Sequence, residues 1–217
     1  MPNLLTSLEI DLHWLGAIAG LGTLAYSLYH MLLAQSRPAG HHTGAARQVL
    51  RTRYLLIATL LFFVLGYILW KPIPMELPWW LQLVISLLGA LIFFTSLVLY
   101  VWGLRSLGES FNASSGLGVR LQQAHRLVTH GPYAYVRHPL YLAVILAGWG
   151  GVLLYRTWSM LFFAILMLGL IVRARKEEQA LAQVFGAEWE KYQQHVPGWF
   201  PDLHKKNRQS GGSRERQ

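Results

Sequence analysis

The chain has 217 residues, of which 53% are hydrophobic and only 13% are charged. This balance excludes an ordinary soluble domain, in which about a quarter of the residues are charged, and predicts an integral membrane protein. The formal charge of +9 does not indicate nucleic-acid binding, because the basic residues lie between apolar runs, where they fix membrane orientation. The absence of cysteine excludes a disulfide framework and a thiolate metal site.

Three apolar runs fill the N-terminal half, and we assign residues 1–104 to a three-helix transmembrane region. The runs are residues 12–34, 54–70 and 81–104. The first is long enough to cross a hydrocarbon core of about 30 Å as a helix, and we expect the other two to be the second and third spans. Glu9 and Asp11 precede the first run in place of the basic start of a signal peptide, so we expect that run to be retained.

Two shorter apolar runs, residues 140–154 and 158–172, predict a transmembrane hairpin. Each is about 22 Å long as a helix, which is short for a full crossing. The segment from Glu177 to His195 has the apolar spacing of an amphipathic helix, which we expect at the cytoplasmic surface. We assign residues 105–201 to a second region and expect residues 202–217, rich in Gly, Ser and charge, to be disordered.

The expected fold class is therefore an all-α polytopic membrane protein with about five transmembrane helices, the last two forming the short hairpin. Arginines are concentrated after the first, third and fifth runs, and basic connections stay in the cytoplasm. This predicts an N-terminus outside and a C-terminus in the cytoplasm. We expect the location to be the bacterial inner (plasma) membrane, with the lipid bilayer as a partner and no bound nucleic acid.

Imidazole, guanidinium and phenol groups are concentrated between His125 and Tyr141, immediately before the hairpin. Gly131-Pro132 is a turn signal and Pro139 suits the first position of a helix, so His138 should lie at the membrane surface, at the mouth of the hairpin.

The end of the hairpin carries a second polar group, Arg173 with the pair Glu177-Glu178. If the two hairpin helices are antiparallel, these residues return to the level of His138, and Arg173 and Glu177 share a helix face because they are four residues apart. The resulting pocket would suit a polar cofactor on one side and a lipid-like substrate on the other. The alternative is that the basic residues anchor lipid phosphates and the acids occupy a solvated helix turn.

The same residues resemble a known family. The run His125-x-Leu-Val-Thr-x-Gly-Pro-Tyr, then Arg137-His-Pro-x-Tyr, then Arg173 with Glu177-Glu178, is similar to the isoprenylcysteine carboxyl methyltransferase family of integral membrane enzymes. The resemblance covers residues 107–201. It implies an S-adenosylmethionine-dependent methyltransferase for a lipid-like or prenylcysteine-like substrate that enters from the membrane, with carboxyl methylation favoured.

The resemblance also implies roles for individual residues. Arg173 corresponds to the family's substrate-side arginine and is the candidate catalytic residue. The residues expected to bind the cofactor are His125, Arg126, Leu127, Val128, Tyr133, His138, Pro139, Leu140, Tyr141 and Glu177. Arg137 and Glu178 are secondary candidates, and no metal is expected. Two positions depart from the family pattern, Ala143 in place of Gly and Gly118 in place of Gln, and both concern substrate-side packing.

Two other functions fit the sequence. A distant similarity in the Arg-His-Pro region would suit an NADPH-dependent reductase acting on a lipid or sterol double bond. A non-enzymatic membrane scaffold would use the same residues to hold lipid headgroups and would bind no cofactor. Among methyltransferase substrates, a prenylated cysteine carboxylate, a phospholipid amine and a small thiol all stay open, as does the oligomeric state.

Overall fold

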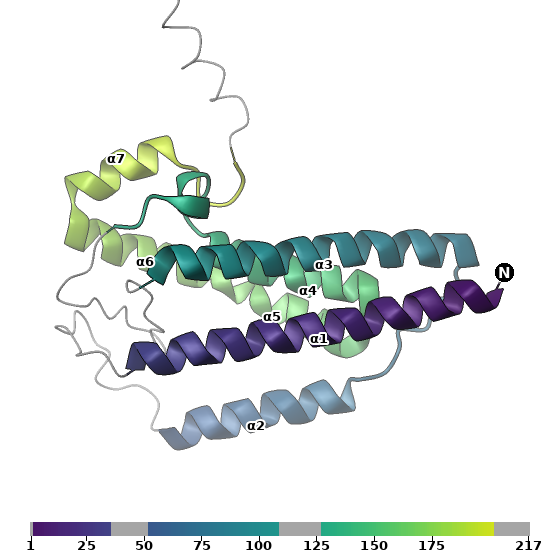
Figure 1. The fold of residues 1–217 in the computed structure, drawn as a ribbon. Helices are drawn as coiled ribbons and strands as arrows, with labels where there is room; N and C mark the ends of the chain where they lie inside the picture. The colour runs from purple at the N-terminus through teal and green to yellow at the C-terminus, as the bar shows by residue number, and fades with distance from the viewer. Residues whose placement is uncertain (1, 36–51, 109–126, 202–217) are drawn as a thin grey trace, which may run out of the picture.

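The computed structural model describes residues 2–35, 52–108 and 127–201, and most of these residues lie in helices (Figure 1). The helices are α1 (Pro2–Gln35), α2 (Thr52–Ile68), α3 (Trp79–Leu107), the 3-10 helix η3 (Gly131–Ala134), α4 (Pro139–Tyr155), α5 (Trp158–Met167), α6 (Gly169–Phe185) and α7 (Ala187–His195). Within this part of the chain there is no strand, only an isolated bridge between Pro72 and Thr157. The all-α class is confirmed for the described residues. The expected disordered tail, residues 202–217, lies outside them.

Two helical segments are long and apolar enough to cross a membrane, Trp79–Leu107 and Trp158–Phe185. The second runs through α5 and α6. Only 28% and 17% of their most apolar stretches are buried inside the protein. Apolar helices that leave most of their surface uncovered need a lipid environment, so both segments are suited to face the acyl chains of a bilayer.

The segment expected to form one amphipathic helix from Glu177 to His195 is divided between two helices. α6 begins before it, at Gly169, and ends at Phe185, and α7 runs from Ala187 to His195. Gly186 separates them with a φ of +48°, a value that glycine adopts without the steric cost paid by other residues. The sequence prediction missed this break and the start of the helix.

α3 and α4 make the most extensive contact among the described helices, and glycines at their crossing explain how close they come. A Cβ added to Gly89 of α3 would lie 2.5 Å from the backbone nitrogen of Leu154, and one on Gly150 of α4 would lie 2.7 Å from that of Phe93. Small residues let membrane helices pack backbone to backbone, which compensates for the missing hydrophobic drive in lipid.

We expect Gly89→Ala to destabilise the protein by about 1–3 kcal/mol, because the new methyl group meets backbone that has no room to move. Thermal unfolding in lipid nanodiscs measures the loss. Gly22→Ala in α1 is the matched control, since nothing lies within 4 Å of its Cβ position. Equal melting temperatures for the two variants would contradict the proposed crossing.

A partly buried polar network holds α1 at the end of the bundle near the α4–α5 turn. The carboxylate of Glu9 accepts a hydrogen bond from Ser86 Oγ at 3.0 Å and pairs with Arg156, whose Nη1 donates to Ser86 Oγ at 2.6 Å. Ser86 is fully buried and Arg156 belongs to the α4–α5 turn. The network therefore joins α1, α3 and the hairpin at one end, while the first turn of α4 lies at the other.

Candidate active site

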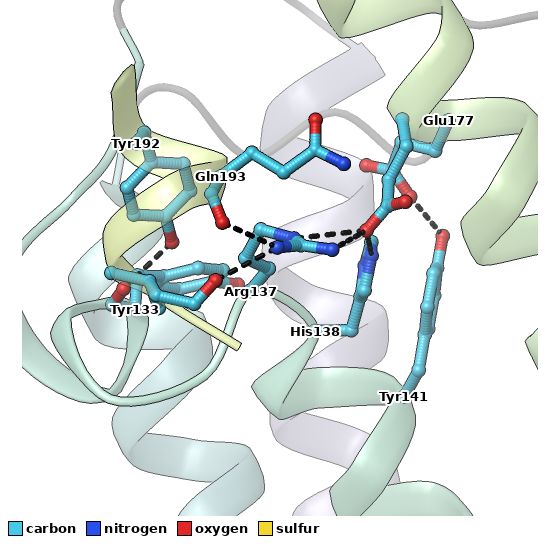
Figure 2. A network of polar contacts seen from close by, with 9 residues as sticks. Tyr133, Arg137, His138, Tyr141, Glu177, Tyr192 and Gln193 are labelled. Carbon is cyan, nitrogen blue, oxygen red and sulfur yellow. Dashed lines mark hydrogen bonds and ion pairs between the residues drawn. The ribbon is translucent and has the colours of Figure 1, made fainter. Parts of the chain in front are cut away.

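The first turn of α4 begins where the sequence predicts it. Pro139 occupies the first helical position, where its fixed φ and missing N–H carry no cost. Before it, η3 starts at Gly131, whose φ is +62°, and it packs Pro132 and Tyr133 into the interior. This local geometry sets His138 and Tyr141 at the end of α4 that faces α6 (Figure 2).

The hairpin returns Arg173 and Glu177 of α6 to this end of α4, as the sequence analysis expected. The hydroxyl of Tyr141 donates a hydrogen bond to Glu177 Oε2 at 2.6 Å (Figure 2). The same hydroxyl accepts a hydrogen bond from Arg173 Nε at 2.9 Å. One phenol thus connects the candidate catalytic arginine with the candidate cofactor-binding acid.

The second acid of the pair, Glu178, has different partners. Its Oε1 lies 2.8 Å from Nε2 of His138 and 2.9 Å from Nη2 of Arg137. The His138 ring is buried and stacks on Tyr141, with the ring planes 9° apart and the centroids 5.7 Å apart. The His138 ring also lies 5.5 Å from the ring of Trp199. Three aromatic rings and the two carboxylates of Glu177 and Glu178 therefore lie close together at this end of α4.

Arg137 binds three parts of the chain at once. Its Nε donates to Glu178 at 3.0 Å, and its Nη1 donates to the main-chain carbonyls of Gln193 at 3.1 Å and Val196 at 2.8 Å (Figure 2). Its guanidinium also lies 5.9 Å from the ring centroid of Trp189 in α7, within the range of a cation–π contact.

The segment after α7 pairs with the loop before α4. The backbone nitrogen of Arg137 donates to the carbonyl of Pro197 at 2.9 Å, and that of His138 donates to Gly198 at 3.1 Å. These contacts hold Trp199 against His138. Trp199 was not among the site residues predicted from the sequence. An aromatic residue within a Pro- and Gly-rich stretch was the available signal.

Tyr192 of α7 fastens the same region to η3. Its hydroxyl donates to the carbonyl of Tyr133 at 2.6 Å. Burial raises the pKa of Tyr192 to about 12, partly offset by the nearby charge of Arg137. Burial, together with the charge of Glu177, also raises the pKa of Tyr133 well above its ordinary value. Both phenols stay protonated at neutral pH, so Tyr192 remains a hydrogen-bond donor there.

The remaining predicted site residues have mixed placements. Leu127 and Val128 are half-buried in the stretch that leads into η3. Pro139 is fully buried, and Leu140 packs against α3 at Gly103. His125 and Arg126 lie outside the described residues. No group of three His, Asp or Glu side chains suited to a metal ion occurs in the described ranges.

Comparison with known proteins identifies relatives of this chain. The model of the isoprenylcysteine carboxyl methyltransferase (ICMT) family matches residues 78–183. Methanethiol S-methyltransferase 2 of Bradyrhizobium diazoefficiens is 31% identical over 167 residues, covering 73% of this chain and 62% of that protein. Protein-S-isoprenylcysteine O-methyltransferase B of Arabidopsis thaliana is 30% identical over 128 residues, covering 57% of this chain and 60% of that protein.

Two further matches are shorter or more distant. Protein-S-isoprenylcysteine O-methyltransferase of Schizosaccharomyces pombe is 34% identical over 96 residues, covering 43% of this chain and 40% of that protein. A solved structure of the eukaryotic intramembrane Ras methyltransferase ICMT is 23% identical, with a TM-score of 0.49, covering 72% of this chain and 55% of that one. The chain spans less than two thirds of the length of these relatives. Residues 78–183 of this chain are similar to the isoprenylcysteine carboxyl methyltransferase family.

Proposed function

We propose that the protein is an integral membrane methyltransferase that uses S-adenosylmethionine and acts on a lipid-like substrate. The observation that carries this proposal is the Tyr141 hydroxyl, which binds Glu177 and Arg173 together. Both residues and the Arg-His-Pro motif lie inside the segment matched by the family. A scaffold that only anchored lipid would not need an arginine, a phenol and an acid in one hydrogen-bonded row.

The chemistry of the site fits the cofactor. Carboxylates accept hydrogen bonds from amino and ribose hydroxyl groups, which supports Glu177 as a cofactor ligand. The rings of Tyr141, His138 and Trp199 offer aromatic faces to a purine and to a positively charged sulfur. When bound, S-adenosylmethionine supplies an electrophilic methyl group. The other residues proposed to bind the cofactor are His125, Arg126, Leu127, Val128, Tyr133, Pro139 and Leu140.

The chain's own contribution is orientation and exclusion of water. A guanidinium binds a carboxylate through two parallel hydrogen bonds, and Tyr141 fixes the Nε side of Arg173. Arg173 would therefore hold an anionic nucleophile beside the cofactor, and correct placement alone lowers a bimolecular barrier by several kcal/mol, roughly 7–11 in well-oriented cases. The apolar helices around the site keep water from competing for the nucleophile.

The membrane arrangement is part of the proposal. We propose five transmembrane helices, an N-terminus outside and a C-terminus in the cytoplasm of a bacterial cell. Residues 1–104 would form most of the membrane platform, and residues 105–201 would carry the site. Substrate would reach Arg173 sideways from the bilayer, while the cofactor would enter from the cytoplasm.

Two substrate classes are supported by the relatives. A prenylcysteine-like carboxylate fits Arg173 best, because the guanidinium recognises a planar anion. A small thiol is the second candidate, since methanethiol S-methyltransferase 1 of Bradyrhizobium diazoefficiens matches over 81% of this chain at 26% identity. A thiolate is also an anion, and Arg173 would hold it with a single contact.

Equilibrium binding and turnover test the proposed function. We expect the protein in nanodiscs to bind S-adenosylhomocysteine and not NADPH, and to transfer a labelled methyl group to a prenylcysteine. A phospholipid amine and a small thiol complete the substrate panel. Binding of NADPH alone would identify a reductase, and binding of neither ligand would leave the scaffold function.

A further inference from the structure

Arg137 stands apart from the other polar residues of the site, because the protein itself occupies each of its side-chain nitrogens. Nε and Nη2 bind Glu178, and Nη1 binds the carbonyls of Gln193 and Val196. The side chain is only 12% exposed. A guanidinium committed in this way has little capacity left for a ligand, so its role differs from that of a direct cofactor contact.

The main-chain acceptors of Arg137 lie at the C-terminal end of α7, where carbonyls have no helical partners. A cation at this end satisfies those carbonyls and complements the helix dipole. Beyond it, the backbone of Arg137 and His138 pairs with Pro197 and Gly198. Side chain and main chain of the Arg-His-Pro loop thus hold residues 193–199, which we call the C-terminal strap.

The strap carries Trp199 to the site. The Trp199 ring lies 5.5 Å from the ring of His138, which also stacks on the ring of Tyr141. The same Arg137 side chain holds Glu178, which binds His138 at 2.8 Å. Arg137 therefore fixes both the partner of His138 and the strap that packs against it.

We propose that Arg137 is a positioning residue that fastens the C-terminal strap over the cofactor site, with the Trp199 ring as one wall of that site. The proposal rests on the proposed function, since the wall is assigned to an S-adenosylmethionine site. It replaces the direct cofactor contact considered for Arg137 with an indirect role. Trp199 becomes an additional cofactor-binding residue.

Hydrogen exchange and ligand binding, measured on the full chain in nanodiscs, test the two halves of the proposal. In Arg137→Gln we expect faster amide exchange across residues 187–201 and unchanged exchange in α3, with S-adenosylhomocysteine affinity reduced about tenfold or more because charge-assisted hydrogen bonds are lost. Arg137→Lys should restore little of the exchange protection or of the affinity, because an ammonium group does not bridge three acceptors as a planar guanidinium does. Trp199→Ala should weaken binding about tenfold while leaving Arg137 in place.

Arg175→Ala is the matched control, since Arg175 is an exposed arginine on α6 close to Glu178 in sequence. It should change neither measurement. Wild-type exchange in the strap of Arg137→Gln combined with lost binding would overturn the proposal in favour of a direct cofactor contact. Wild-type affinity in Trp199→Ala would overturn the wall. If the unmodified protein bound no S-adenosylhomocysteine, the proposed function would fail, whereas the exchange result would still report whether Arg137 holds the strap.

Discussion

Arg173→Ala is expected to reduce methyl transfer by about a thousandfold or more while leaving affinity for S-adenosylhomocysteine within about twofold, as for other groups that position charge during a reaction. The guanidinium is proposed to hold the substrate anion, and its loss leaves that anion without a fixed partner. Glu177 keeps its hydrogen bond from Tyr141 in the variant, because Arg173 binds the same phenol from the other side. Single-turnover methyl transfer and calorimetry on the same preparation measure the two effects.

Tyr141→Phe tests whether the orientation of Arg173 matters, because it leaves the charge of Arg173 in place. The phenylalanine ring retains the stacking on His138 but removes both the hydrogen bond that orients Nε of Arg173 and the one donated to Glu177. We expect an intermediate loss of turnover. Tyr155→Phe, at the opposite end of α4, removes a comparable phenol that donates to the carbonyl of His13, and serves as the control. Loss of cofactor binding in Arg173→Ala would contradict the role assigned to Arg173.

The place of the site along the chain could be predicted because local rules apply there. Pro139 follows a turn signal and proline is favoured at the first position of a helix, while an antiparallel hairpin of two similar runs brings its two ends together. The meeting of His138 with the acids of α6 follows from these facts alone. The helix positions over the apolar runs follow from their length and composition.

The choice of partners within the site could not be predicted. Glu177 and Glu178 are adjacent, but neighbouring residues on a helix point about 100° apart. One therefore binds Tyr141 and the other binds His138 and Arg137. The rotation of α6 about its axis decides which of the two acids faces Tyr141 and which faces His138. That rotation depends on packing along the whole helix.

The C-terminal strap was also beyond sequence reasoning. Gly186 has the small size that permits a break, yet glycine also occurs inside helices, as Gly150 of α4 shows. Once the chain turns at Gly186, α7 can bring residues 197–199 back to the loop before α4. Such pairing joins residues some 60 positions apart, as 137 and 197 are, and leaves no periodic pattern in the sequence.

His138→Ala and Glu177→Gln are each expected to weaken S-adenosylhomocysteine binding, by about tenfold to a hundredfold, since each removes one partner of a partly buried hydrogen-bonded group. In His138→Ala the rings of Tyr141 and Trp199 lose their common neighbour, and Glu178 loses one of its two cationic or donor partners. In Glu177→Gln the shape is kept while the charge that favours amino and hydroxyl donors is removed. Calorimetry in nanodiscs measures both affinities.

Glu190→Gln in α7 is the charge-matched control for Glu177→Gln, because Glu190 is exposed and should leave affinity unchanged. His138→Gln adds a second test at the imidazole position, since an amide can still donate to Glu178 but offers no aromatic face. If stacking dominates, His138→Gln should bind as weakly as His138→Ala, and if the contact with Glu178 dominates, it should recover most of the affinity. Wild-type affinity in both His138→Ala and Glu177→Gln would refute the cofactor site at the first turn of α4.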